Sequence, residues 1–350
     1  MLVVNSRFLT QNITGVQRFA IEISKLLKIL LGEKVQFVSP KSIIDDELAK
    51  ELGVKTIGSK SGHLWEQIDL PKYLKSIGSP LVLNLANTAP FFYRNKIVTV
   101  HDIAYERFPQ TFDWKFRLFY KLLIPNIIKT SKHTLTVSEF SKNEIHNLYG
   151  TNLENISVVY NAVNEIFKPK KIETNQKYIL AVSSLNYQKN FHSLVKAFNQ
   201  LDDKSTKLYL VGSINKNFAS IELLSEIEKN TNIVFKGRVD DNELIELYSN
   251  AICFVYPSLY EGFGIPPLEA QACGCPVICS SVASLPEVGG VDSVVYCDPY
   301  SVEDIASKIK MVLNDASLQN ELKEKGFENI KRFSWEESAK KIIEVLEDLE

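Results

Sequence analysis

Two glutamates bracket a short run of glycine and proline, and their spacing is the first feature that could do chemistry. The stretch YEGFGIPPLEA holds Glu261 and Glu269. Pro266 and Pro267 suit the first turn of a helix, where a missing N–H costs nothing, so residues 259–265 are expected to form the preceding loop. Both carboxylates can then address one bound molecule, and carboxylates accept hydrogen bonds from sugar hydroxyls. Taken singly, each glutamate could instead be an ordinary surface or helix-dipole charge.

The loop between the two glutamates is itself a predicted anion site. Gly262 and Gly264 make the loop pliable. The amides from Gly262 through Phe263 and Gly264 to Ile265 are expected to be exposed at the positive end of the helix dipole. A phosphate group of a ligand would bind there.

Five further residues follow predicted strands and are either polar or suited to a turn. Lys189, in AVSSLNYQKNF, lies at the mouth of a helix, where it would neutralise a pyrophosphate. Arg238 follows another strand and could assist. In the first half of the chain, Gly15 lies in a strand-to-helix loop, and His101 and Asp102 come directly after a strand. Each has an ordinary alternative: a solvated cation, a turn glycine or a hydrogen-bonded structural histidine.

The elements that must position these residues alternate along the chain. Short apolar runs are followed by amphipathic stretches of helix length, which is typical of parallel sheets covered by helices. The expected strands are LVVN, PLVLNLA, KIVTVHD and HTLTVS in the first half and KYILAVSS, KLYLVGS, NIVFKGRV, AICFVYPS, PVICSS and SVVYCDP in the second. A polar, lysine-rich joint at 165–176 divides the chain into two such sets. The sequence predicts an α/β protein with two doubly wound, Rossmann-like domains, 1–168 and 169–333, whose ligands bind beyond the carboxyl ends of the strands. A final helix, 334–350, is expected to pack back toward the first domain.

Composition and charge limit the class of protein. The 350 residues are 45% hydrophobic and 23% charged. No apolar run reaches the ~20 residues needed to cross a bilayer, and the chain begins without a basic leader, which predicts a cytoplasmic protein. Residues 1–170 carry 22 Lys and Arg against 15 Asp and Glu, while the remainder is acidic. A basic half suits an anionic membrane surface or a phosphate-bearing acceptor, although ordinary solvated surface explains it equally well. No nucleic-acid motif occurs.

Neither a metal nor another cofactor is expected. Cys273, Cys275 and Cys279 crowd one segment, but no histidine accompanies them at metal spacing. They are expected to be reduced core thiols. No Asp-x-Asp motif follows a strand, so cationic side chains and helix amides would neutralise a diphosphate.

The stretch from FKGRVDD to SSLPEVGG closely resembles the retaining family 4 glycosyltransferases of GT-B fold, whose signature is two glutamates separated by seven residues. The resemblance extends over nearly the whole chain. It implies that Glu261 bonds the donor-sugar hydroxyls, Glu269 the nucleotide ribose and Lys189 the diphosphate. The His-Asp pair is similar to that of mannosyl- and rhamnosyltransferases. This implies that His101 faces the donor sugar and that Asp102 orients it or supports the loop.

The resemblance also implies the reaction. A sugar would pass with retention from a nucleoside diphosphate-sugar, GDP-mannose being the favourite, to a hydroxyl of a growing surface glycan such as lipid-linked O-antigen or capsule. The loop with Gly15 would approach the donor phosphates or the acceptor. The basic segment DWKFRLFYKLLIPNIIKTSKH either packs on the sheet or touches a membrane, or does both. Two alternatives stay open: a GT-B-fold nucleotide-sugar epimerase, and a non-catalytic sugar-nucleotide binding protein.

Overall fold

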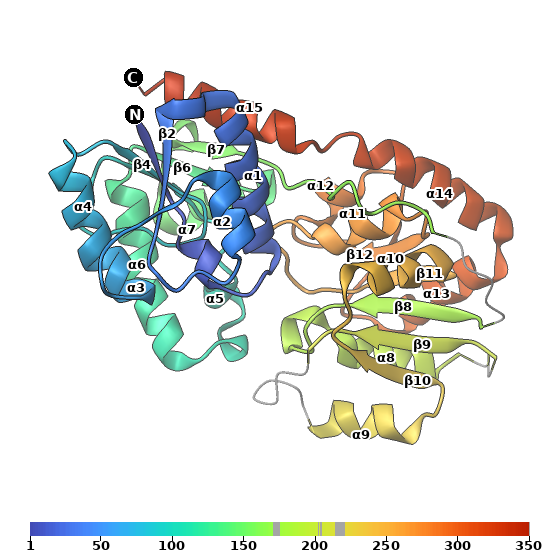
Figure 1. Cartoon of the computed structure of the whole chain (residues 1–350). Helices are drawn as coiled ribbons and strands as arrows, with labels where there is room; N and C mark the ends of the chain where they lie inside the picture. Colours follow the sequence, from blue (N-terminus) through green and yellow to red (C-terminus); the bar gives the residue numbers. More distant parts are fainter. Residues whose placement is uncertain (171–175, 202, 204, 214–220, 350) are drawn as a thin grey trace. The chain divides into compact units, whose positions relative to one another are not determined.

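The computed structural model describes residues 1–170, 176–201, 203, 205–213 and 221–349. Part of the predicted joint, residues 171–175, lies outside this description. The chain forms two compact units, and Figure 1 shows a sheet flanked by helices in each. Unit 1 comprises Met1–Glu106, Trp114–Asn161 and Ser334–Glu350, and unit 2 comprises Arg107–Asp113 and Ala162–Phe333.

Unit 1 is built on a seven-stranded parallel sheet in the order β3-β2-β1-β4-β5-β6-β7. Its strands are β1 (Leu2–Asn5), β2 (Val35–Ser39), β3 (Lys55–Thr56), β4 (Leu81–Asn84), β5 (Lys96–Thr99), β6 (His133–Thr136) and β7 (Ile156–Val158). Its longer helices are α1 (Gly15–Leu31), α2 (Asp46–Leu52), α4 (Leu70–Ser76), α6 (Trp114–Thr130), α7 (Glu139–Tyr149) and α15 (Trp335–Glu347).

Unit 2 is built on a six-stranded parallel sheet in the order β10-β9-β8-β11-β12-β13. Its strands are β8 (Tyr178–Val182), β9 (Lys207–Val211), β10 (Ile233–Gly237), β11 (Cys253–Tyr256), β12 (Val277–Ser280) and β13 (Val295–Cys297). Its helices are α8 (Phe191–Asn199), α9 (Ile221–Lys229), α10 (Asp241–Asn250), α11 (Ile265–Ala272), α12 (Leu285–Gly289), α13 (Val302–Asn314) and α14 (Ala316–Ile330).

Strand alternation divides the core of unit 2 between the two faces of its sheet. Along β8, Ile179 and Ala181 join one apolar cluster, whereas Tyr178 and Leu180 join the other. All five cysteines are unpaired and buried within these two clusters, as expected for core thiols. Burial raises the pKa of each thiol well above its ordinary range.

The last helix belongs to unit 1. The Ser334 hydroxyl accepts a hydrogen bond from the Glu337 amide at 3.3 Å and so caps the N-terminus of α15. Helix α15 packs against α1, as Figure 1 also shows. The hydroxyl of Ser338 donates to the Tyr160 carbonyl at 2.6 Å, which ties α15 to the segment after β7.

Each sheet has one point where the strand order reverses. In unit 1 the chain proceeds outward from β1 to β3 and then resumes on the other side of β1 with β4. In unit 2 it proceeds from β8 to β10 and resumes beside β8 with β11. The loops that leave neighbouring strands in opposite directions open a crevice at the carboxyl edge, where ligands bind in such sheets. The β8/β11 and β1/β4 edges are therefore the places to look for chemistry.

Candidate active site and family

An ion pair lies at the switch point of unit 2. Lys189 follows β8, Glu261 follows β11, and the Lys189 Nζ is 2.6 Å from Glu261 Oε1. The side chains are only 16% and 10% exposed. Because two charges lose most of their hydration there, such a pair contributes little net stability. Its position at the crevice favours a role in binding a ligand.

A buried tyrosine joins the pair from the sheet itself. Tyr256, the last residue of β11, donates a 2.8 Å hydrogen bond to Glu261 Oε1 and lies 3.5 Å from Lys189 Nζ. Burial raises the pKa of the Tyr256 hydroxyl well above its ordinary range, and the negative charges of Glu261 and Glu269 raise it further. The phenol therefore stays protonated and acts as a donor. Sequence reasoning missed Tyr256, although its place at the strand end before the glutamate loop was a usable signal.

The second glutamate has a tyrosine of its own. Tyr248, on α10, donates to Glu269 Oε2 at 3.3 Å. Burial raises the pKa of Tyr248 well above its ordinary range, and the charge of Glu269 adds to the effect. Glu261 is thus held by a tyrosine of a strand and Glu269 by a tyrosine of a helix. Both carboxylates lie close enough to Tyr256 to raise the pKa of its hydroxyl.

The loop before α11 has a fixed shape. Gly264 has φ +98°, and a Cβ there would lie 2.6 Å from a methyl of Leu285. The Ser284 hydroxyl is within hydrogen-bonding distance of the carbonyls of Glu261 (2.9 Å) and Phe263 (2.8 Å). The residues from Glu261 to Gly264 are all buried, so the prediction of an exposed, pliable loop was wrong. Ser284 and Leu285 cover and pin it instead.

The loop after β8 directs Lys189 to the site. The Lys189 amide donates to the Asn186 side chain at 3.1 Å. Asn190 then takes a left-handed conformation, φ +60°, and its side-chain amide donates to the carbonyls of Pro257 (3.0 Å) and Pro299 (2.7 Å). Lys189 therefore faces Glu261, whereas the neighbouring Asn190 connects three loops that follow strands.

Two more residues brace this edge of the sheet. Gln188 is buried and donates to the Tyr260 carbonyl at 2.6 Å. Gly212, directly after β9, has φ +143°, and a Cβ there would lie 1.8 Å from the Ser183 carbonyl oxygen. Sequence reasoning missed Gly212, although a glycine at the end of an apolar strand signals such a close approach.

Comparison with known proteins shows the family. A family model described as Glycosyltransferase Family 4 matches residues 13–165, and one described as Glycosyl transferases group 1 matches residues 162–329. The O-antigen chain mannosyltransferase RfbU of Salmonella typhimurium is 35% identical over 257 residues, which cover 72% of this chain and 71% of the relative. The chain belongs to the family 4 glycosyltransferases.

One further relative and one solved structure extend the comparison. The O-antigen chain mannosyltransferase B of Escherichia coli is 33% identical to this glycosyltransferase over 270 residues, 73% of this chain and 70% of that protein. The crystal structure of Anabaena Alr3699/HepE in complex with UDP-glucose superposes with a TM-score of 0.79 at 16% identity, covering 99% of both chains. These likenesses confirm the predicted family and the predicted GT-B fold of two Rossmann-like domains.

The second cation predicted for the donor phosphates follows a strand two places from β8 in the sheet. Arg238 is exposed after β10, and β9 separates that strand from β8. Strands are ~4.8 Å apart, so its backbone starts about 10 Å from the β8 edge. It makes no hydrogen bond or ion pair with the described residues, and the structure does not bring it to Lys189.

The first-half candidates lie in unit 1. His101 is buried, and its Nε2 is 3.0 Å from the Leu85 carbonyl oxygen, so Nε2 carries the proton and Nδ1 is left as an acceptor. Burial lowers the pKa of His101 to about 4, which keeps the imidazole neutral near pH 7. The Asp102 carboxylate accepts from the Ala104 amide at 2.9 Å, which supports the loop. Gly15 is the first residue of α1.

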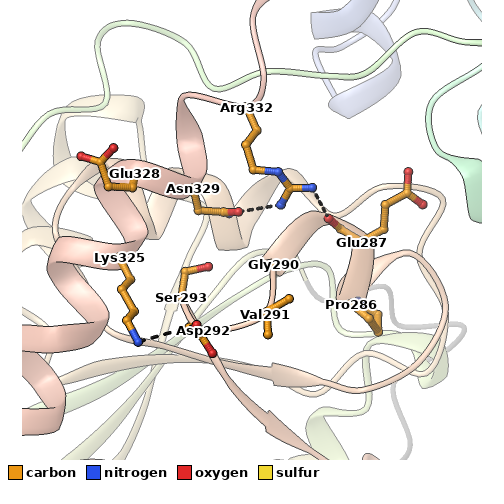
Figure 2. Close-up of a pocket in the computed structure, with 10 residues that line it drawn as sticks. All are labelled: Pro286, Glu287, Gly290, Val291, Asp292, Ser293, Lys325, Glu328, Asn329 and Arg332. Carbon is orange, nitrogen blue, oxygen red and sulfur yellow. Dashed lines mark hydrogen bonds and ion pairs between the residues drawn. The ribbon is translucent and has the colours of Figure 1, made fainter.

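A separate hollow of about 540 Å³ lies on another part of unit 2, between the loop after α12 and α14 (Figure 2). Its guanidinium, Arg332, donates to the Asn329 side chain at 2.7 Å and to the Glu287 carbonyl at 3.1 Å. Asn329 in turn donates to Gln271 at 2.8 Å. Gln271 lies two residues after Glu269 in α11, on the opposite face of the helix. The hollow is therefore distinct from the tyrosine–glutamate site. Its lining residues are Pro286, Glu287, Gly290, Val291, Asp292, Ser293, Lys325, Glu328, Asn329 and Arg332.

Within the described part of the chain, no three or more His, Cys, Asp or Glu side chains are grouped so that they could hold a metal ion.

Proposed function

We propose that this glycosyltransferase moves a mannosyl group from a nucleoside diphosphate-mannose, GDP-mannose in the first instance, to a hydroxyl of a growing, lipid-linked surface glycan. The observation that carries the proposal is the Lys189–Glu261 pair at the switch point of unit 2. The O-antigen mannosyltransferases among the relatives support the choice of sugar and acceptor.

The donor would be held by the groups that the two loops present. Glu269 accepts from the ribose hydroxyls and Glu261 from the sugar hydroxyls. Glu261 Oε1 already accepts from Lys189 and Tyr256, whereas Oε2 has no hydrogen-bond partner among the described residues, which leaves it for the donor. When the donor binds, Lys189 leaves the Glu261 carboxylate and forms a charge-assisted hydrogen bond with the diphosphate instead.

Transfer would then proceed without a metal. The bond between the sugar C1 and the diphosphate oxygen breaks, and Lys189 stabilises the negative charge of the leaving group. The acceptor oxygen forms its bond to C1 on the same face, and its proton passes to the departing phosphate, which retains the configuration. In this proposal the neutral imidazole of His101 forms a hydrogen bond with the donor sugar. No metal or other cofactor takes part in this scheme.

A membrane contact belongs to the same proposal. In the described residues no helix is long and apolar enough to span a bilayer. The first half of α6, however, exposes Trp114 (64%), Leu118 (54%) and Leu122 (66%) beside the exposed Lys115 and Lys121. Apolar side chains with flanking lysines fit the interface of an anionic lipid surface. We propose that an anionic lipid surface binds this half of α6, because a lipid-linked acceptor would be anchored in that membrane.

The deciding experiment is a calorimetric titration with GDP, UDP, dTDP and ADP in the presence of a chelator. Wild type should bind GDP with preference, and Lys189→Ala and Glu269→Ala should each weaken binding at least ten-fold. Lys170→Ala is the matched control, since Lys170 forms an exposed pair with Glu246 in the same unit. If no nucleotide binds, or if both variants bind as wild type does, the assignment of the donor site fails.

A further inference from the structure

The switch point of unit 1 holds a buried, charged cluster that the proposed donor chemistry does not use. Arg7 Nε lies 3.3 Å from Glu66 Oε1, and both residues are buried. The same oxygen accepts from Asn5 Nδ2 and from the Thr88 hydroxyl, each at 2.9 Å. Asn5 ends β1 and also donates to Asn84, which ends β4, at 3.0 Å. The cluster thus lies at the carboxyl ends of the two strands that flank the crevice.

The carboxylate of this cluster is charged. Burial alone would raise the pKa of Glu66, but attraction to Arg7 and hydrogen bonds from His63 and Asn5 outweigh it, and the net shift is downward. A buried ion pair is weak evidence for stability, since apolar residues of similar volume commonly serve as well or better. The position of the Arg7–Glu66 ion pair at the switch point therefore indicates a role in binding rather than in stability.

The second oxygen of Glu66 addresses a side chain that reaches solvent. Oε2 lies 3.4 Å from Nδ1 of His63, whose side chain is 42% exposed, and His63 is the one partner of that oxygen among the described residues. The Phe119 ring, from α6, lies 4.7 Å from the imidazole. Because the carboxylate only accepts, Nδ1 carries the proton, and Nε2 is left without a hydrogen bond to the described residues.

The local backbone explains how Glu66 reaches inward. Residues Trp65–Asp69 form a turn of π-helix, a wide and costly conformation that is frequent at functional sites. Trp65 anchors the turn by donating from Nε1 to the Ile57 carbonyl at 2.8 Å. Gln67 anchors it on the other side by donating to the Ala89 carbonyl at 3.0 Å. The turn thus holds Glu66 in the interior and leaves His63, just before it, at the surface.

We propose that Nε2 of His63, fixed by Glu66 and Phe119, binds a hydroxyl of the acceptor sugar. The charges indicate the class of ligand. Arg7 and Glu66 neutralise each other, so the cluster has no excess positive charge with which to bind an anion. What it offers is Nε2 of His63, which can form a hydrogen bond with a neutral hydroxyl group. His63 contacts the ligand, and Glu66 is a positioning residue. The inference rests on the proposed function only in taking the acceptor to be a glycan.

The test measures binding of methyl α-glycosides of mannose, galactose, glucose and N-acetylglucosamine by saturation-transfer NMR. Wild type should bind at least one glycoside, and His63→Ala should bind it at least five-fold more weakly. The matched control is His146→Ala, because Nδ1 of this half-buried histidine of α7, in the same unit, lies 2.8 Å from the Thr151 carbonyl oxygen. The melting temperature and the nucleotide Kd should be unchanged in His63→Ala.

Two results would overturn the inference: equal glycoside binding by wild type and His63→Ala, or no binding of any of the four glycosides by wild type. Failure of the nucleotide titration counts against the proposed donor site alone, because the glycoside measurement is made without nucleotide.

Discussion

The Tyr256 hydroxyl donates to Oε1 of Glu261 at 2.8 Å, the same oxygen that pairs with Lys189 at 2.6 Å. If Lys189 turns to a diphosphate, Tyr256 still holds the carboxylate in place. The orientation of Glu261 therefore does not depend on the cation that the donor takes away. A fixed hydrogen-bonding group that needs no rearrangement is what a preorganised site requires.

Removal of this hydroxyl should affect turnover rather than nucleotide affinity. Tyr256→Phe leaves the Glu261 carboxylate with Lys189 as its one donor among the described residues, so we expect kcat/KM for the donor sugar to fall about 10- to 100-fold, or ~1.4–2.7 kcal/mol. The Kd for the free nucleoside diphosphate should change less than three-fold. Initial rates and calorimetry measure the two quantities.

Tyr178→Phe is the control for Tyr256→Phe. Tyr178 is a buried tyrosine of the neighbouring strand, and its hydroxyl donates to the Leu247 carbonyl at 2.9 Å. Its loss should cost about as much stability, ~1 kcal/mol, without loss of activity. Equal activities of the two variants would contradict the role assigned to Tyr256.

A methyl group at Gly212 should break the β8/β9 edge. Gly212→Ala would place Cβ 1.8 Å from the Ser183 carbonyl oxygen, and the φ of +143° is unsuited to an L side chain. We expect a loss of about 3 kcal/mol or more in the free energy of unfolding, measured with urea. Gly237→Ala is the comparison, because φ is +75° there but a Cβ meets no atom within 4 Å. It should lose only about 1 kcal/mol, and similar losses in both would rule out the clash.

Acid should destabilise unit 1 through His101. Its pKa is lowered to about 4 in the folded state, against about 6.5 unfolded. Between these values the unfolded state binds more protons, so stability is lost as the pH falls from about 6.5 through 4. The full effect is on the order of 3 kcal/mol. His101→Gln should be less sensitive to pH, as urea unfolding at pH 7 and pH 4.5 would show, and identical pH slopes for both proteins would contradict the assignment.

The sequence predicted much of the second sheet and less of the first. All six strands of unit 2 were predicted, because each is a short apolar run between polar loops. In unit 1, β2, β3 and β7 were not predicted, since β3 has only two exposed residues and the others include polar Gln36 and Ser157. Short mixed strands depend on their neighbours in the sheet, which local patterns do not report.

The same limit applies to the site. Glu261, Glu269 and Lys189 were identified from motifs, but Tyr248 was not, because its contact with Glu269 joins residues 21 apart in the chain. The Glu66 cluster joins residues 22 to 79 apart through Asn5, Asn84 and Thr88, and a π-helical turn has no sequence pattern distinct from that of an α-helix. Long-range polar contacts of this kind become visible only in the folded chain.

The exposed half of α6 gives a direct test of the membrane contact. Leu118 and Leu122 are exposed, so glutamate at both positions should leave the melting temperature unchanged while it removes apolar area and adds negative charge. We expect Leu118→Glu/Leu122→Glu to bind vesicles of 70% phosphatidylcholine and 30% phosphatidylglycerol at least ten-fold more weakly in co-sedimentation. Salt at about 0.5 M should weaken wild-type binding, since it screens Lys115 and Lys121. Leu148→Glu is the control, as Leu148 is 41% exposed on α7 of the same unit. Wild type that fails to sediment with these vesicles, or a double variant that sediments equally well, would exclude α6 as the membrane-binding surface.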